Sequence, residues 1–189
     1  MEMHLEDEDS FPLLSINPAL VKIATLGHQD LYMDLAYFWL LQSLIVPENS
    51  LENADEIYRK IHLLMKHHPK IESLYTLSCF VMALDYHRPK LCEEFANEGM
   101  KALPKSWMIP ATTAYMFAFV LKDPVKGSYF YKKTESLPQR PDFLVKLSER
   151  LMQGGVHPED GDQALRSMIE EADDPDYKEF LIRYLNKQH

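Results

Sequence analysis

Prolines recur along this chain at an almost constant spacing, and this period constrains the fold more than any other feature. Three segments that begin with proline follow one another at steps of 35 and 34 residues, at Pro89, Pro124 and Pro158. A second series has nearly the same step, with members at Pro69, Pro104, Pro138 and Pro175. A period near 34 residues with a proline in each unit predicts stacked pairs of antiparallel helices. Such stacks usually bind other proteins.

The apolar pattern between the prolines divides the chain into helical pairs. In the first pair, Ile57, Ile61 and Leu64 recur at three- and four-residue steps and give one helix an apolar face. The expected pairs are 30–43 with 53–67, 71–86 with 89–102, 109–122 with 124–136, and 141–153 with 158–172. A proline suits the first turn of each second helix, because the first amides of a helix have no intrahelical acceptor. An amphipathic segment at 177–185 is expected to cap the stack.

Small side chains recur 13 positions apart in three successive pairs. They are Cys79 with Cys92, Ala114 with Gly127, and Ser148 with Gly161. Antiparallel helices that pack closely need small side chains where they cross, so each of these pairs is expected at a crossing. For the two cysteines two interpretations stay open: a pair of buried small apolar residues, or a disulfide or thiol switch.

In this register the chain resembles the tetratricopeptide-repeat (TPR) proteins. The family's small, aromatic and closing proline positions match Cys79, Cys92, Ala96, Gly99 and Pro104 in one unit, and Ala114, Gly127, Tyr131 and Pro138 in the next. The resemblance covers roughly residues 30–175, although the Trp, Leu-Gly and Tyr of the family's first helix are mostly missing. It implies an all-α fold in which antiparallel helix-pair repeats stack as a short right-handed superhelix with a C-terminal capping helix. A non-repeating helical bundle is the alternative.

The N-terminal residues are expected to lie outside the repeats. Residues 1–10 carry five carboxylates and little to bury, which predicts a disordered acidic tail. Residues 11–29 are expected to form a separate segment with a short helix, and residues 30–189 the repeat domain. One hypothesis is that residues 11–27 fold back and fill the concave face of the stack.

The resemblance also implies a binding surface, because the first helices of TPR units line the concave face. The predicted partner-binding residues are Tyr37, Leu41, Thr76, Phe80, Met108, Tyr115 and Phe119. This set is aromatic and apolar rather than basic, so we expect it to bind an apolar or amphipathic segment of another protein. The alternative interpretation is that these side chains form a packed core.

The net charge narrows the classes of partner that we expect, and the cysteine content favours one cellular compartment. The chain has 20 basic and 29 acidic residues, a net charge of −9, which disfavours nucleic acid and anionic membrane surfaces and is compatible with a basic protein segment. Two cysteines predict no disulfide framework, and a cytoplasmic location is expected. The longest apolar run spans 35–46, well short of the ~20 residues that cross a bilayer.

No motif in the sequence nominates a reaction. His62, His67 and His68 lack the spacing of a metal site, and no cofactor, metal or catalytic residue is expected. The sequence therefore favours a non-enzymatic protein–protein interaction adaptor or scaffold. The alternatives are an acidic TPR-type chaperone for a secreted client, and a helical-bundle enzyme or enzyme regulator with an unidentified site. Self-association into a homodimer through the C-terminal helix is also compatible with the sequence.

Overall fold

The computed structural model describes residues 54–154 and 158–187, together with residues 23, 25, 26, 28, 31, 32, 34–38 and 40. It divides into two compact units, Met1–Ile71 and Glu72–His189. All regular secondary structure within the described residues is helical, which confirms the all-α prediction. The predicted acidic tail and most of the predicted segment 11–29 lie outside the described residues.

The first unit contains α3 (Ala54–His67), at the position predicted for the second helix of the first pair. Its apolar side chains at Ile57, Ile61 and Leu64 are buried. Acidic residues occupy its first turn and basic residues its last turn, which complements the helix dipole. Where the first helix of this pair was predicted, the described positions between 31 and 40 are also helical.

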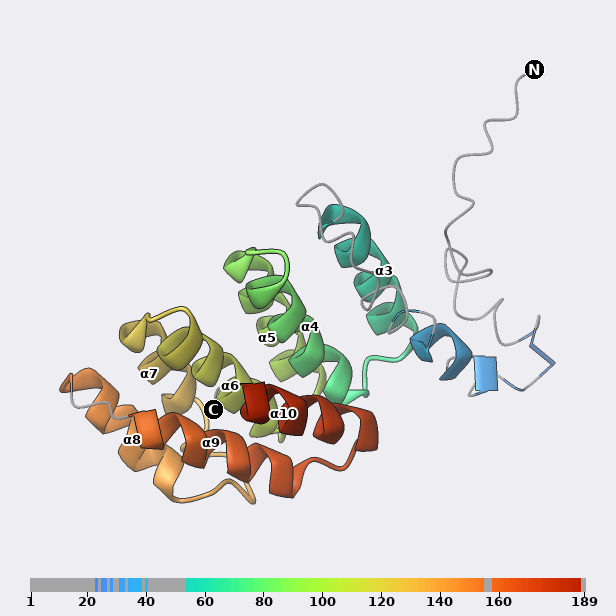
Figure 1. The fold of residues 1–189 in the computed structure, drawn as a ribbon. Coiled ribbons are helices and arrows are strands. Elements are labelled where there is room, and N and C mark those ends of the chain that lie inside the picture. The colour runs from blue at the N-terminus through green and yellow to red at the C-terminus, as the bar shows by residue number, and fades with distance from the viewer. Residues whose placement is uncertain are drawn as a thin grey trace. The chain divides into compact units, whose positions relative to one another are not determined.

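The second unit contains the remaining helices (Figure 1). They are α4 (Glu72–Leu84), α5 (Pro89–Ala102), α6 (Met108–Tyr115), the π-helical turn η2 (Met116–Val120), α7 (Pro124–Lys132), α8 (Phe143–Met152), α9 (Pro158–Glu171) and α10 (Pro175–Lys187). Each lies within a few residues of a predicted helix. Helix α10 begins two residues earlier than predicted because the Asp174 carboxylate accepts from the amides of Asp176 and Tyr177 at 2.9 and 3.0 Å.

The turns that precede α5 and α7 have the same backbone geometry, 35 residues apart. His87 and Lys122 both adopt a positive φ, at 52° and 58°. A backbone hydrogen bond to a carbonyl six residues earlier closes each turn. The Arg88 amide donates to the Met82 carbonyl at 2.6 Å, and the Asp123 amide donates to the Phe117 carbonyl at 2.8 Å. The proline that follows each turn opens the next helix. The sequence period is therefore a period of local structure as well.

Helices α4 and α5 cross at Cys79 and Cys92. Their Cα atoms are 3.9 Å apart and a disulfide joins them, with an S–S distance of 1.98 Å. Of the two interpretations that the sequence left open for these cysteines, the structure contains the disulfide. Small side chains at a close crossing bring the two sulfur atoms within reach of each other.

The other two crossings differ from the predicted register. Gly127 lies against Ala118 rather than Ala114, so closely that a Cβ on the glycine would be 2.5 Å from the Ala118 Cβ. Gly161 lies against Phe119, while Ser148 bonds to Ser128 of α7. Ala118 lies one turn after Ala114, within the π-helical turn η2, so the close approach falls one turn later than predicted.

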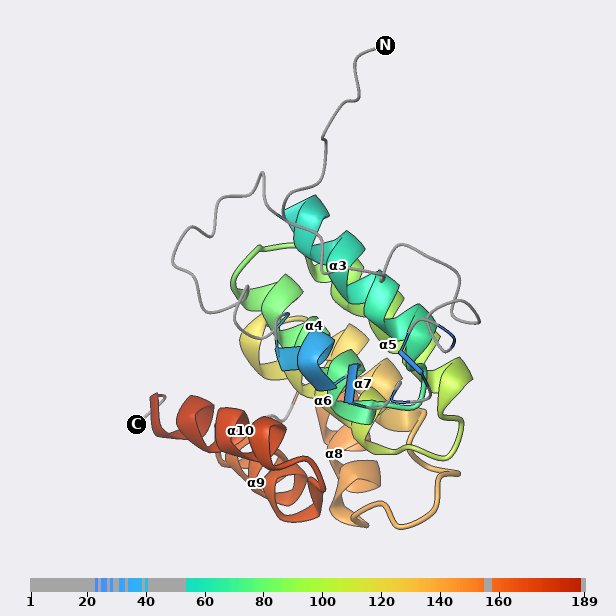
Figure 2. The ribbon, with the colours of Figure 1, turned by 90° about the vertical axis from the view of Figure 1, so that its right-hand side faces the viewer.

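The helices of the second unit pack mostly against their neighbours in sequence. Helices α4 and α5 pair, α6 packs on both, and α7 packs on α6, η2 and α8. The predicted fourth pair is not a close one, because α9 packs mainly on α6 and α10. Figures 1 and 2 show α9 beside α10. An ion pair of 2.7 Å between Arg150 and the buried Asp160 links α8 to α9.

Candidate functional site

Three aromatic side chains of neighbouring helices form a row, which we call the aromatic face: Phe80 on α4, Tyr115 on α6 and Phe119 in η2. Phe80 and Tyr115 are 35 residues apart in sequence and their ring centroids are 6.3 Å apart. Phe119 continues the row, 5.4 Å from Tyr115. Phe80 and Tyr115 are buried and Phe119 is half-buried.

Helix α10 covers the aromatic face with aromatic side chains of its own. Phe180 lies 5.2 Å and Tyr184 5.4 Å from the Phe80 ring, both edge-on. Tyr184 also lies 6.3 Å from Tyr115. Edge-to-face pairs at these distances are favourable beyond the apolar area that they bury. The aromatic face therefore has an occupant, an amphipathic helix of the same chain.

Polar contacts fix the direction of α10. At its start, the Ser73 hydroxyl donates to the Asp174 carboxylate. At its end, burial raises the pKa of Asp85 above its ordinary value, and the charge of Lys187 offsets part of this rise. The start of α10 therefore lies near the start of α4, and the end of α10 lies near the end of α4. The backbone of α10 packs against α9, whereas it reaches α4 and α6 mainly through side chains.

The predicted binding residues separate into three groups. Thr76, Phe80, Met108 and Tyr115 are buried, and the Thr76 hydroxyl donates within its own helix to the Ser73 carbonyl at 3.1 Å. Phe119 is half-buried, as is Tyr37, which belongs to the Met1–Ile71 unit. Leu41 and most of the segment 11–27, the hypothetical occupant of the concave face, lie outside the described residues. The role of all seven in partner binding stays a prediction.

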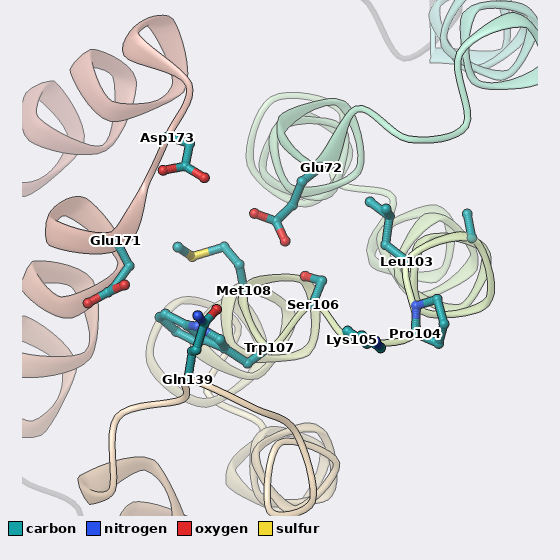
Figure 3. A pocket seen from close by; sticks show the side chains of 11 residues that line it. Glu72, Leu103, Pro104, Lys105, Ser106, Trp107, Met108, Gln139, Glu171 and Asp173 are labelled. Carbon is teal, nitrogen blue, oxygen red and sulfur yellow. The ribbon is translucent and has the colours of Figure 1, made fainter.

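A cleft of about 830 Å³ opens beside the starts of α4 and α6 (Figure 3). We call it the acidic cleft. Its lining residues are Glu72, Ala102, Leu103, Pro104, Lys105, Ser106, Trp107, Met108, Gln139, Glu171 and Asp173. They come from α4, the α5–α6 connection, the α7–α8 connection and the end of α9. Four separate segments contribute, so no sequence spacing predicts this cleft.

Carboxylates dominate the charge of the acidic cleft. Glu72, Glu171 and Asp173 line it, and Lys105 is its basic residue. Burial raises the pKa of Glu72 above its ordinary value of 4.5, and the charge of Asp173 raises it further, while a hydrogen bond with the Ser106 side chain lowers it. The Ser106 hydroxyl also accepts from the Ile109 amide at 3.3 Å. The hydrogen bond with Ser106 therefore holds Glu72 in place, but it offsets only part of the free-energy cost of ionising this buried carboxyl.

Trp107 forms part of the cleft wall. Its side chain is 7% exposed, and no hydrogen bond from its indole N–H reaches any of the described residues. Trp107 lies 35 positions after Glu72, so both residues stand immediately before or at the start of a first helix. The 35-residue period is a signal that could have connected these two positions, but it points to no other part of the cleft.

Comparison with protein-family models, curated protein sequences and solved structures gives no match to this chain. In the described part of the chain, none of the helices has the length and apolarity needed to cross a bilayer.

Proposed function

We propose that this chain is a non-enzymatic adaptor that binds an amphipathic helix of another protein on the aromatic face, in exchange with its own helix α10. One observation carries the proposal: α10 already lies on that face with Phe180 and Tyr184 against Phe80. A surface that accepts one amphipathic helix has the shape and chemistry to accept another with the same apolar spacing. The occupant defines the expected ligand, a helix with aromatic residues at positions i, i+3 and i+7.

The proposal includes the TPR-like arrangement that the sequence predicts. The matching turns before α5 and α7 support stacked helix pairs, because their φ values and closing hydrogen bonds repeat after 35 residues. In such a stack the first helices of successive units lie side by side and present a continuous face. We include the right-handed superhelix in this proposal.

The way α10 is attached favours exchange. It contacts α4 and α6 through side chains, and the only covalent cross-link among the described residues is elsewhere, between α4 and α5. Individual helices open locally with free energies below that of global unfolding. A partner helix must then compete with an intramolecular ligand, which raises its apparent dissociation constant.

A peptide with the sequence of residues 174–187 tests this proposal on the full-length chain. In the variant Phe180→Ala/Tyr184→Ala the resident helix is weakened, and a fluorescent copy of the native peptide is expected to bind this variant at least tenfold more tightly than the unaltered protein. Fluorescence anisotropy measures both affinities. A peptide that carries the same two alanines is expected to bind neither protein.

Ile182 provides the matched control, because it lies on α10 but is 41% exposed. The variant Ile182→Ala is expected to bind the peptide no better than the unaltered protein. Adding Tyr115→Ala to the weakened variant is expected to abolish binding, since it removes part of the aromatic face. Equal peptide affinity for the weakened and unaltered proteins would contradict the proposal. Dimers in light scattering would identify a second copy's α10 as the natural occupant.

We retain the cytoplasm as the proposed location, and the disulfide makes this testable. Reducing compartments keep cysteine pairs as thiols. A maleimide reagent added to the source cells as they are lysed in denaturant is expected to label Cys79 and Cys92 without prior reduction. Labelling only after reduction would place the protein in an oxidising compartment.

A further inference from the structure

Two hydroxyl groups bind polar groups of α10 beside the aromatic face. Ser73 on α4 is buried, and its hydroxyl donates to the Asp174 carboxylate at the start of α10. Thr112 on α6 is also buried, and its hydroxyl lies 3.1 Å from the hydroxyl of Tyr177 on α10. Helix α10 is therefore held by directional hydrogen bonds as well as by the contacts between aromatic rings.

The Thr112 hydroxyl is arranged to accept a hydrogen bond from α10. Its own proton is directed to the sulfur of Met168 on α9, a weak acceptor 3.5 Å away. Its oxygen can then accept from the Tyr177 hydroxyl. Thr112 is 0% and Tyr177 3% exposed, so water does not reach this contact while α10 is in place. A phenylalanine at position 177 would exclude water in the same way and supply no donor, which costs free energy.

Asp174 sets the register in which Tyr177 meets Thr112. Its carboxylate accepts from two amides of the first turn of α10, at 2.9 and 3.0 Å, and from the Ser73 hydroxyl. Tyr177 and Phe180 follow Asp174 at three-residue steps, which places them on one face of the helix. The cap therefore fixes both the start of the helix and the position of its first aromatic residue.

We propose that Thr112 makes the aromatic face selective for partner helices that carry a tyrosine, rather than a phenylalanine, three residues after a capping aspartate. A matching helix has the pattern Asp-x-x-Tyr-x-x-Phe-x-x-x-Tyr, which is that of residues 174–184. A site that bonds a hydroxyl rejects the analogue without it, because its own buried polar group is then left unpaired. The inference rests on the proposed adaptor function and names a side chain that the partner must carry.

The test compares two fluorescent peptides of residues 174–187 on the full-length variant Phe180→Ala/Tyr184→Ala. One peptide has the native sequence and the other carries Tyr177→Phe, which keeps the ring and removes the hydroxyl. Tyrosine and phenylalanine have similar helix propensities, so the free peptides do not differ in this respect. Both compete with the same resident helix, which leaves the ratio of their dissociation constants unaffected. We expect the phenylalanine peptide to bind about tenfold more weakly in fluorescence anisotropy.

Two valine substitutions in the same variant assign the preference to one hydroxyl. Thr112→Val is expected to bind the phenylalanine peptide at least as tightly as the native one, because the tyrosine hydroxyl then has no acceptor at this position. Thr113→Val is the matched control. The Thr113 hydroxyl is equally buried but donates within its own helix to the Ile109 carbonyl at 2.8 Å, so this variant is expected to keep the preference for tyrosine.

Two results would overturn this inference alone: equal affinity of the two peptides for the weakened variant, or an unchanged preference for tyrosine in Thr112→Val. Either leaves the adaptor proposal standing, because the native peptide still binds. If neither peptide binds the weakened variant, the docking site is rejected and the inference with it. Circular dichroism verifies that each variant is folded. If Thr112→Val does not fold, the comparison of the two peptides on the weakened variant decides by itself.

Discussion

Two helix contacts in the second unit are built in opposite ways. Where α7 meets the α6–η2 helix, Gly127 lies directly against Ala118 and the backbones approach closely. Where α10 meets α4 and α6, aromatic side chains span the gap and the rings are 5.2 to 6.3 Å apart. The first contact has no room for an added atom. The second is an interface of large side chains, which another helix with similar side chains can reproduce.

The difference separates a fixed helix crossing from the proposed binding surface. A backbone-to-backbone crossing depends on small residues at fixed positions in both helices, so it defines the fold. A side-chain interface with a terminal helix resembles a protein–protein interface, with a few aromatic anchors that carry most of the energy. The predictions below test this difference in order of decreasing expected effect.

Substitution at the close crossing is expected to have the largest effect. In Gly127→Ala the new Cβ would lie 2.5 Å from the Ala118 Cβ, so one helix must move. We expect the free energy of unfolding to fall by about 3 kcal/mol, as overpacked contacts typically do. Chemical denaturation measures the loss. Val125→Ala, on the same helix but exposed, is expected to change it by less than ~0.5 kcal/mol, and an equal loss in both variants would refute the packing argument.

Weakening the side-chain interface is expected to have a smaller and local effect. Phe180→Ala removes one ring from the aromatic contact, at a local cost of about 2 kcal/mol. Amide hydrogens of α10 should then exchange roughly 30-fold faster while those of α4 and α7 keep their protection. Native-state hydrogen exchange with mass spectrometry reads each helix separately. Equal loss of protection in α4 and α7 would show that α10 is part of the scaffold.

Tyr131, which is buried in the second unit, offers a substitution that is expected to stabilise the protein rather than destabilise it. Its hydroxyl is buried and has no hydrogen-bond partner among the residues that the structure describes. Burial, followed by the charges of Tyr115 and Asp160, raises its pKa well above the ordinary value. Removing an unsatisfied buried hydroxyl relieves its desolvation cost, so Tyr131→Phe is expected to stabilise the protein by about 1 kcal/mol. Thermal denaturation detects the shift. Tyr129→Phe, at an exposed position, is the control, and destabilisation by Tyr131→Phe would mean that the hydroxyl has a partner.

The smallest expected effect is a pH dependence of the unfolding free energy, caused by Glu72 in the acidic cleft. The pKa of Glu72 is raised by folding, so its contribution to stability is fully present below its ordinary value of 4.5 and is lost as pH rises through the folded value. The unfolding free energy of the unaltered protein, relative to Glu72→Gln, should therefore decrease as pH rises from about 4 towards 7. Urea denaturation at several pH values gives the difference. A difference that increases with pH would mean that the Glu72 charge is compensated in the folded state.

The helices were predictable because their signals are local. Proline at the first turn of α5, α7 and α9 marks helix starts through its fixed φ and missing amide, which act within a few residues. The apolar spacing of α3 acts over one or two turns. The Asp174 cap is equally local, but the prediction did not use it and placed the start of α10 two residues late. The aromatic residues Phe80 and Tyr115 were found for the same reason, since they repeat after 35 positions.

The contacts between helices were less predictable. The 13-residue register held at Cys79 and Cys92 but failed at Gly127, where the close approach falls one turn later, at Ala118, and the sequence offers small residues at both turns. The acidic cleft was missed because Glu72, Trp107, Gln139 and Asp173 are distant in sequence and each is ordinary in its own segment.

The sequence by itself determined where helices begin and end and which turns repeat, because caps, prolines and apolar periods act over a few residues. Only the tertiary structure decided that α10 returns to cover Phe80 and Tyr115 and that three carboxylates gather beside Trp107. Both depend on which segments meet after the chain has packed, and that is set by the summed burial and close approach of many side chains rather than by any short stretch of sequence.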